Sequence, residues 1–260
     1  MSLSTRTVGA IAPLAFAVFF ANAAQAQVFE IIHPDVEQGE VELEVLSGVI
    51  LEDVEEGEER SAYEFAVGYG VTSFWKTTVA VEFADIDGEG LEYEAFEWEN
   101  VFLLPFGSGG HDHNHGGHES GVSLEALGFY AALEVPDEGG FDSGAIVLGP
   151  LAEARFGPVT TVANLFVEIP FEGGENEALV YAVSAAVDVT ENFALGIEAF
   201  GEVENVFESD TDSELFIGPA AYFDFDLGNG RHVEPRVALL VGTEDEQPDA
   251  ALSLNVEMKF

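Results

Sequence analysis

The sequence predicts an all-β protein: a transmembrane antiparallel up-and-down β-barrel of about 12 strands that follows a cleaved signal peptide. Three observations lead to this prediction. They are an apolar amino-terminal leader, apolar and polar residues that alternate with period two from Glu40 onward, and a last strand that ends on the aromatic residue Phe260. Period-two alternation indicates strands with one apolar and one polar face, as a membrane barrel requires.

The leader, residues 1–26, carries one basic residue, Arg6, followed by an apolar stretch and a close of small residues. This arrangement is typical of a secretory signal peptide, and we expect cleavage after Ala26. The alternative is a membrane anchor, but about thirteen apolar residues are short for a helix that needs roughly twenty to cross a bilayer. We therefore predict an exported chain with a periplasmic amino-terminal segment, 27–39, before the first strand.

The composition excludes several classes of function. Seven Lys and Arg stand against fifty Asp and Glu, and the net charge is -43. Such a chain cannot neutralise phosphates, so nucleic acid is excluded as a partner, whereas cations are attracted. A hydrophobic content of 47% argues against disorder, and the absence of cysteine leaves no disulfide or thiolate metal site. Adaptation to a salty environment is an alternative explanation for the acidity.

The alternating segments are long enough to cross a bilayer, which takes roughly 9 to 11 tilted residues per strand. In the first, Val41, Leu43 and Val45 share one face and the glutamates between them share the other. Helix has no clear support anywhere after the leader. The strands are expected at 40–52, 60–71, 74–85, 91–103, 122–135, 143–156, 159–170, 177–188, 193–204, 214–226, 232–242 and 249–260.

The connections between these segments alternate in kind. Bacterial barrels place short turns in the periplasm and longer loops outside the cell, so the alternation gives the chain a direction. The tight set lies at 70–75, 156–159, 188–193 and 227–231, and the acidic set at 53–59, 85–90, 136–140, 172–176, 205–213 and 243–248.

The last strand places five apolar residues on one face and four polar residues on the other. Its aromatic end resembles the assembly signal of bacterial outer-membrane proteins, so we expect the barrel assembly machinery and outer-membrane lipid as partners. Aromatic residues near segment ends fit the interfacial girdles of such barrels. The aromatic residues in question are Phe74, Trp75, Trp98, Phe102, Phe193, Phe223 and Phe225.

Three short motifs, His33-Pro-x-Val-x-x-Gly-Glu-x-Glu-Leu-Glu44, Tyr69-Gly-Val-Thr-x-x-Trp75 and Glu97-Trp-Glu-Asn100, resemble a family of uncharacterised proteobacterial outer-membrane β-barrels. The resemblance runs over most of the chain after the leader. It implies a barrel fold and a Gram-negative outer-membrane location, and it brings no established reaction or active-site residues. The connection after the third motif is a compact turn in that family, whereas here it is a long insertion.

That insertion forms a His-rich loop, 107–120. Neutral imidazole is the commonest metal donor, and imidazole with carboxylate suits Zn, Ni or Cu(II). The alternative is a solvated tract that binds metal incidentally, and a catalytic zinc site is not expected because the loop offers no rigid scaffold. Counting strands from either end places this loop on the periplasmic side. The candidate metal ligands are His111, Asp112, His113, His115, His118 and Glu119.

Acidic residues recur on the polar faces of the strands, which should line the lumen because charges cannot face lipid cheaply. A bulge at Ala95-Phe96 would keep both acidic pairs of the fourth strand facing inward. Arg236 and Lys259 are the expected inward bases. The principal lumen candidates are Glu42, Glu44, Glu64, Glu82, Glu92, Glu94, Glu97 and Glu99, and further ones are Glu40, Glu134, Glu168, Glu198, Glu202, Asp224, Asp226 and Glu234.

A lumen lined with carboxylates favours cations, so we expect a monomeric, cation-preferring channel for small solutes or metal ions that requires no cofactor. A non-conducting barrel that serves as a metal-binding or partner-binding surface protein is the alternative. We do not expect an enzyme, because neither His33 nor His232 has a nucleophile motif beside it. A secreted β-sandwich is the competing fold.

Overall fold

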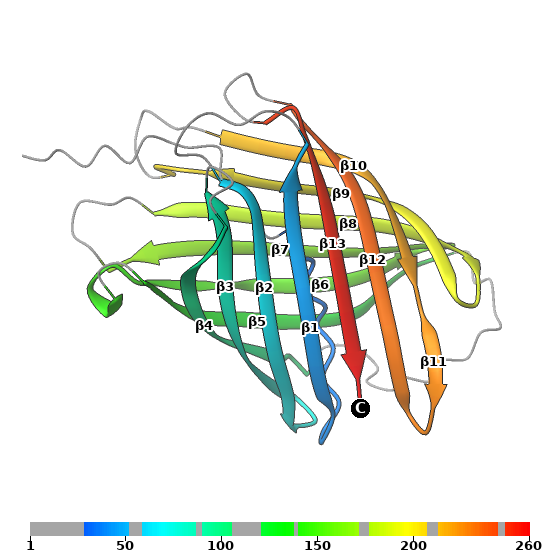
Figure 1. Cartoon of the computed structure of the whole chain (residues 1–260). Coiled ribbons are helices and arrows are strands. Elements are labelled where there is room, and N and C mark those ends of the chain that lie inside the picture. The colour runs from blue at the N-terminus through cyan, green and yellow to red at the C-terminus, as the bar shows by residue number, and fades with distance from the viewer. Residues whose placement is uncertain are drawn as a thin grey trace, which may run out of the picture.

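The computed structural model describes residues 29–51, 59–86, 90–105, 121–137, 140–171, 177–206, 213–243 and 248–260. Nearly all of them belong to antiparallel strands (Figure 1). Within this part of the chain, no helix is long and apolar enough to cross a membrane. The strands are β1 (Val41–Ile50), β2 (Glu59–Thr72), β3 (Trp75–Ile86), β4 (Leu91–Leu103), β5 (Val122–Pro136), β6 (Ala145–Phe156), β7 (Val159–Pro170), β8 (Ala178–Thr190), β9 (Phe193–Val203), β10 (Ser213–Phe223), β11 (Phe225–Gly228), β12 (Arg231–Gly242) and β13 (Ala250–Lys259).

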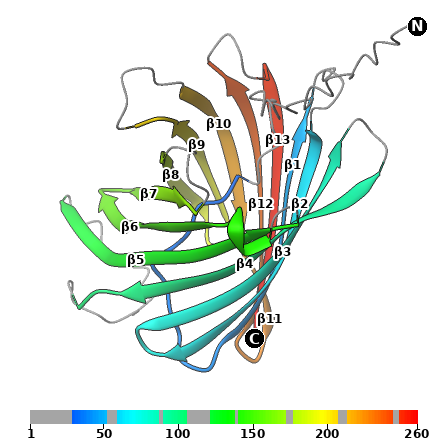
Figure 2. The same cartoon turned by 90° about the vertical axis from the view of Figure 1, so that its left-hand side faces the viewer.

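The sheet closes on itself into a 12-strand antiparallel barrel, which Figure 2 shows from a second side. Each strand pairs with the next along the chain, except that β10 pairs with β12, and β1 pairs with β13, where Glu42 lies opposite Lys259. β10 and β11 are two parts of one barrel strand, because only Asp224 separates them and both pair with β12. The predicted antiparallel barrel of 12 strands is therefore confirmed, and its strands lie close to the expected positions. A single 3-10 turn, Gly140–Asp142, is the one helical element of the described residues.

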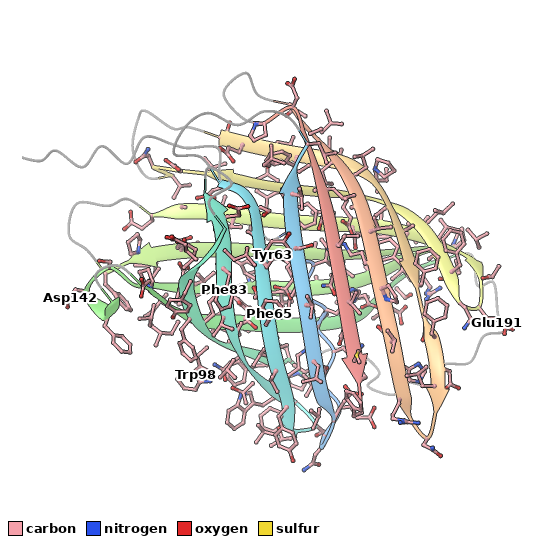
Figure 3. All side chains as sticks on the ribbon, viewed as in Figure 1. Tyr63, Phe65, Phe83, Trp98, Asp142 and Glu191 are labelled. Atoms are coloured by element: carbon pink, nitrogen blue, oxygen red, sulfur yellow. The ribbon has the colours of Figure 1, made fainter. Side chains whose placement is uncertain are left out.

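Apolar side chains cover the outside of the barrel, as Figure 3 shows for Phe65, Phe83 and Trp98 on β2, β3 and β4. The same alternation leaves Val41, Leu43 and Val45 of β1 exposed, while Glu42 is 3% exposed on the inner face. A water-soluble barrel would show the opposite distribution. This exterior is that of a barrel surrounded by lipid.

Aromatic pairs lie near both ends of the barrel wall. At the end that carries the short turns, Trp75 stacks on Phe102 at 6.2 Å, and Phe193 packs on Phe223 at 5.1 Å. At the other end, Phe83 makes an edge contact with Tyr93 at 5.9 Å. These positions agree with the aromatic girdles expected at the two interfaces of a membrane barrel.

The bulge predicted in β4 is present, one residue before the expected position. Glu82 of β3 pairs with Ala95, but its neighbour Phe83 pairs with Tyr93, so Glu94 is the additional residue. Because of this additional residue, Ala95 points into the barrel and is buried. The alternating residues Phe96 and Trp98 point outward and are exposed.

The ends of the strands have the predicted polarity. β4 ends beside the short β2–β3 turn, where the amide of Leu103 donates to the carbonyl of Phe74 at 2.8 Å, and Gly121 lies beside the β6–β7 turn. The carboxyl terminus, Phe260, is at this same end (Figure 1). The connection that contains the His-rich loop therefore leaves and re-enters the barrel at its short-turn end, although 106–120 itself lies outside the described residues.

Candidate functional site in the barrel lumen

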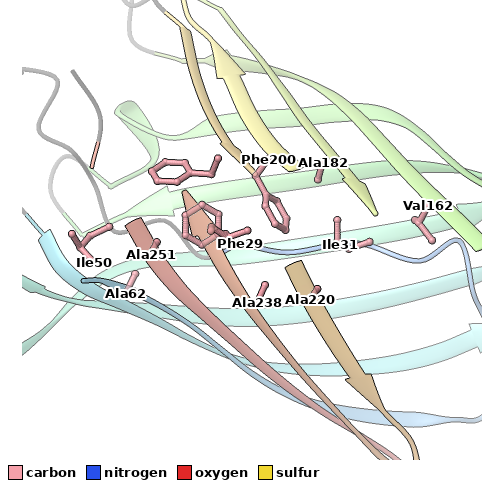
Figure 4. Packing of buried hydrophobic residues seen from close by; sticks show 12 residues of the cluster. Phe29, Ile31, Ile50, Ala62, Val162, Ala182, Phe200, Ala220, Ala238 and Ala251 are labelled. Atoms are coloured by element: carbon pink, nitrogen blue, oxygen red, sulfur yellow. The ribbon is translucent and has the colours of Figure 1, made fainter. Parts of the chain in front are cut away.

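The interior of the barrel contains the chain's own amino-terminal segment, residues 29–39, which we call the lumenal segment. The sequence predicted 27–39 as a periplasmic segment that precedes the barrel, but the structure places its described part inside. Phe29 is 2% exposed and packs against Phe200 and Phe216, with ring centroids 5.2 and 5.1 Å away. Figure 4 shows Phe29 and Ile31 enclosed by side chains of several strands.

Two polar side chains of the wall hold the backbone of this segment. The Asn164 amide of β7 donates to the carbonyl of Ile32 at 2.8 Å and accepts from the amide of the same residue at 2.9 Å. On the other wall, Arg236 of β12 donates to the carbonyl of Phe29 at 2.9 Å. Both contacts satisfy buried backbone groups that no strand pairs.

The segment enters the barrel wall through a tight turn beside β2. The amide of Gly39 donates to the carbonyl of Gly70 at 2.8 Å, and the amide of Gly70 donates to the carbonyl of Glu40 at 3.0 Å. A Cβ at Gly70 would lie 1.9 Å from the carbonyl oxygen of Glu37, so a glycine is required there. Gly39 has a φ of +91°, in the left-handed region that favours glycine.

On one side of the lumenal segment lies an acidic chamber of about 470 Å³. Its apolar lining includes Phe166 and Phe200, and the Tyr130 hydroxyl donates to Glu99 at 2.6 Å. Among the described residues, no lysine, arginine or histidine lines it. Its nine carboxyl groups are those of Glu30, Glu64, Glu82, Glu94, Glu97, Glu99, Glu134, Glu168 and Glu202.

Several of these carboxylates face one another across neighbouring strands. Glu64 of β2 is directly opposite Glu82 of β3, and Glu97 of β4 is directly opposite Glu134 of β5. Like charges in direct cross-strand register destabilise a sheet. The chamber therefore gathers carboxyl groups in direct cross-strand register, and no lysine, arginine or histidine of the described residues lines it.

A second lumenal space, of about 870 Å³, lies on the other side of the segment and contains the basic residues. Lys76 donates to Glu42 at 2.6 Å, and Lys259 contacts Glu234 and Glu257, each at 3.2 Å. The two spaces thus differ in their ionisable side chains. Apart from tyrosines, those of the described residues that line the acidic chamber are all carboxylic acids, whereas the second space contains carboxylates paired with bases.

The most buried ion pair joins Arg236 and Glu198, which are 8% and 1% exposed. The guanidinium donates to both carboxylate oxygens of Glu198 at 2.6 Å, and the Tyr222 hydroxyl donates to the same carboxylate at 2.8 Å. Arg236 also donates to Ser253 at 3.1 Å and lies 5.6 Å from the centre of the Phe200 ring. This network joins β9, β10, β12 and β13 to the lumenal segment.

Two clusters in the second space have the composition of a metal site. Asp224, His232 and Glu234 form one, and Glu42, Glu44 and Glu257 form the other. In the first, His232 is already 2.9 Å from Asp224, and Lys259 neutralises Glu234. In the second, Lys76 bonds to Glu42. Each cluster therefore contains a carboxylate that is already paired with a lysine.

At the mouth of this space, Glu40 precedes β1. Burial raises the pKa of its carboxyl to about 7, and the charge of Glu42 and a hydrogen bond to it add to the rise. The negative charge at this mouth therefore increases as the pH passes through neutrality.

The structure brings most of the predicted lumen residues together, but into two groups. Glu64, Glu82, Glu94, Glu97 and Glu99 line the acidic chamber. Glu42 and Glu44 line the second space, and Glu92 is exposed near the start of β4. The predicted metal ligands His111, Asp112, His113, His115, His118 and Glu119 lie outside the described residues.

Sequence reasoning missed four lumenal residues that matter here: Glu30, Lys76, Tyr130 and Asn164. Lys76 and Tyr130 occupy inward positions of their strands, so strand parity could have found both. Asn164 also occupies an inward position of its strand, but its bonds to the backbone depend on the lumenal segment folding back into the barrel. Glu30 lies in that segment and carried no comparable signal.

Comparison with known proteins supports the fold. No family model matches the sequence, and no curated protein matches it. Among solved structures, the KdgM porin in complex with disordered oligogalacturonate is similar over 85% of this chain and 98% of that chain, with a TM-score of 0.50 and 7% identity. The translocator domain of the autotransporter NalP from Neisseria meningitidis covers 86% of this chain and 88% of its own, with a TM-score of 0.44 and 11% identity.

Proposed function

We propose that this barrel lies in the outer membrane of a Gram-negative bacterium and gives small cations or metal ions a passage through it. The acidic chamber carries this proposal. Its nine glutamates line one continuous space, and among the described residues no lysine, arginine or histidine lines it with them. Carboxylate-lined pores favour cations, and the low dielectric of the barrel wall strengthens the field inside such a space.

The likeness to a porin supports the barrel architecture and brings no solute with it. What this chain passes follows from its own charges. A polyanion would meet the chamber's carboxylates without compensating bases, whereas a cation would replace water between paired glutamates such as Glu97 and Glu134. We therefore assign cations, not acidic sugars, to this lumen.

Cation preference is tested by the reversal potential of single barrels in planar bilayers under a salt gradient. A carboxylate attracts a monovalent cation about 4 Å away by about 1 kcal/mol in water, so the variant Glu97→Gln/Glu134→Gln should lower the cation-to-anion permeability ratio roughly fivefold or more. The control Glu125→Gln/Asp142→Asn removes the same charge from exposed positions and should leave the ratio nearly unchanged. Anion preference in the wild type would overturn the proposal.

A second candidate function is a non-conducting, cation-binding barrel, and the lumenal segment favours it. Phe29, Ile31 and Ile32 are buried within the lumen and fill part of the path. Absence of any openings from a folded sample, together with retained cation binding, would select this candidate.

The His-rich loop remains a separate prediction about the short-turn end of the barrel. We expect the wild type to bind Zn(II), Ni(II) or Cu(II) in calorimetry, with a variant lacking 108–119 losing at least one class of site because the imidazoles are removed. Equal metal binding by both proteins would show that the His-rich loop is not a metal site.

Location in the outer membrane has its own test. The protein should resist carbonate extraction, require detergent, and migrate as a heat-modifiable band on electrophoresis. A carbonate-extractable protein would contradict both the location and the passage.

A further inference from the structure

We propose that the lumenal segment is a plug bound in a peptide-recognising track of the barrel wall, and that its release connects the acidic chamber with the second lumenal space. The inference rests on the proposed cation passage. It adds the element that opens and closes this passage and the chemistry that holds that element in place.

The segment is the partition between the two spaces. Glu30 and Ile32 line both the acidic chamber and the second space, so one short stretch of chain has a cavity on either side. A cation in the acidic chamber has to pass this stretch to reach the space that contains Lys76 and Lys259. Movement of the segment would therefore join the two cavities.

The wall recognises the segment through its backbone. Asn164 bonds to both the amide and the carbonyl of Ile32, which is the pair of bonds that a neighbouring strand would supply. Arg236 and Ser253 both reach the carbonyl of Phe29, at 2.9 and 3.4 Å. Contacts of this kind bind an extended peptide with limited dependence on its side chains.

The wall is also shaped for the segment's apolar side chains. Phe29 and Ile31 pack in a cluster in which five of the ten buried wall residues are alanine, and Figure 4 shows these small residues around the two side chains. Alanine at inward positions leaves space that larger side chains would fill. The contributing alanines are Ala62, Ala182, Ala220, Ala238 and Ala251.

Within the described residues, the segment continues into the barrel wall through the turn at Gly39 and Gly70. With no cysteine in the chain, no disulfide fixes it to the wall. Release would require breaking the backbone contacts and withdrawing Phe29 from its aromatic neighbours, while the turn keeps the segment attached to the barrel.

Conductance of the full chain in planar bilayers tests the plug against the variant Asn164→Ala. Loss of two backbone hydrogen bonds should raise the open fraction roughly tenfold. The control Asn255→Ala makes the same change at a lumenal asparagine of β13 and should behave like the wild type. An equal open fraction in all three proteins would refute the plug.

A deletion of 29–36 gives the second test, with heat-modifiability confirming that the barrel has folded. The deleted barrel should stay open and keep its cation preference, and a synthetic peptide of residues 29–40 should bind it and restore the block. If the deleted barrel neither opens nor binds the peptide, the proposal of a peptide-recognising track is refuted. If the deleted barrel binds the peptide but shows no cation-selective openings, the peptide-recognising track is supported and the proposed passage is refuted. If the deleted barrel does not fold, the conductance of the variant Asn164→Ala decides whether the segment is a plug.

Discussion

Replacing Arg236 by methionine is expected to lower the free energy of unfolding by about 3–5 kcal/mol, because it leaves the carboxylate of Glu198 buried and without its countercharge. Glu198 is 1% exposed, and the guanidinium contacts both of its oxygens at 2.6 Å. The same substitution removes the bond to the Phe29 carbonyl, so the lumenal segment should loosen as well. Urea unfolding in lipid vesicles, followed by the fluorescence of Trp75 and Trp98, measures the change.

Two further variants separate the buried charge from a general effect of losing an arginine. Arg231 is exposed at the start of β12, and Arg231→Met should change stability by no more than about 0.5 kcal/mol. The double variant Arg236→Met/Glu198→Gln should recover much of the loss, because it removes both charges and keeps an acceptor for the Tyr222 hydroxyl. If the single variant were as stable as the wild type, the ion pair would not hold this part of the barrel together.

The barrel wall could be predicted closely from the sequence because its signals are local. The segment expected at 91–103 coincides with β4, and the one at 159–170 coincides with β7. Apart from the bulge in β4, the face on which each residue of these strands lies follows from the residues two positions before and after it. Even the bulge in β4 was visible, because the acidic residues change phase between Glu94 and Glu97.

The contents of the lumen could be predicted only in part. Inward acids such as Glu64 and Glu99 follow from strand parity, but their division between two spaces does not. That division depends on the lumenal segment, whose partners Asn164 and Arg236 are 132 and 207 residues away along the chain. Residues 29–39 have neither strand alternation nor helical periodicity, so no local pattern indicates that they are buried.

Because the position of the lumenal segment could not be predicted, the distribution of charge in the lumen appeared simpler in the sequence than it is in the structure. Summed along the strands, the inward residues suggest one uniformly acidic lumen. The fold instead collects Lys76, Arg236 and Lys259 on one side of the lumenal segment, where each is paired with carboxylates. The acidic chamber on the other side is lined by nine glutamates and, among the described residues, by no lysine, arginine or histidine.

Replacing Ile197 by arginine is expected to cost about 2–4 kcal/mol of stability, because this residue lies in the middle of β9 and faces outward, where the barrel meets lipid. Its side chain is 54% exposed, while the next residue, Glu198, points into the lumen. Val189 also faces outward, with 56% exposed, but lies near the end of β8. Val189→Arg should cost only about 0–1 kcal/mol, since arginine there can reach the interface.

The comparison of these two arginine variants decides what surrounds the barrel. In water, both positions would be exposed surface sites, and both substitutions would change stability by no more than about 0.5 kcal/mol. In a bilayer, the cost has to increase with depth, because only the central arginine is far from both interfaces. A loss confined to Ile197→Arg, measured by urea unfolding in vesicles, is therefore the result that lipid contact requires, and equal small losses at both sites would contradict it.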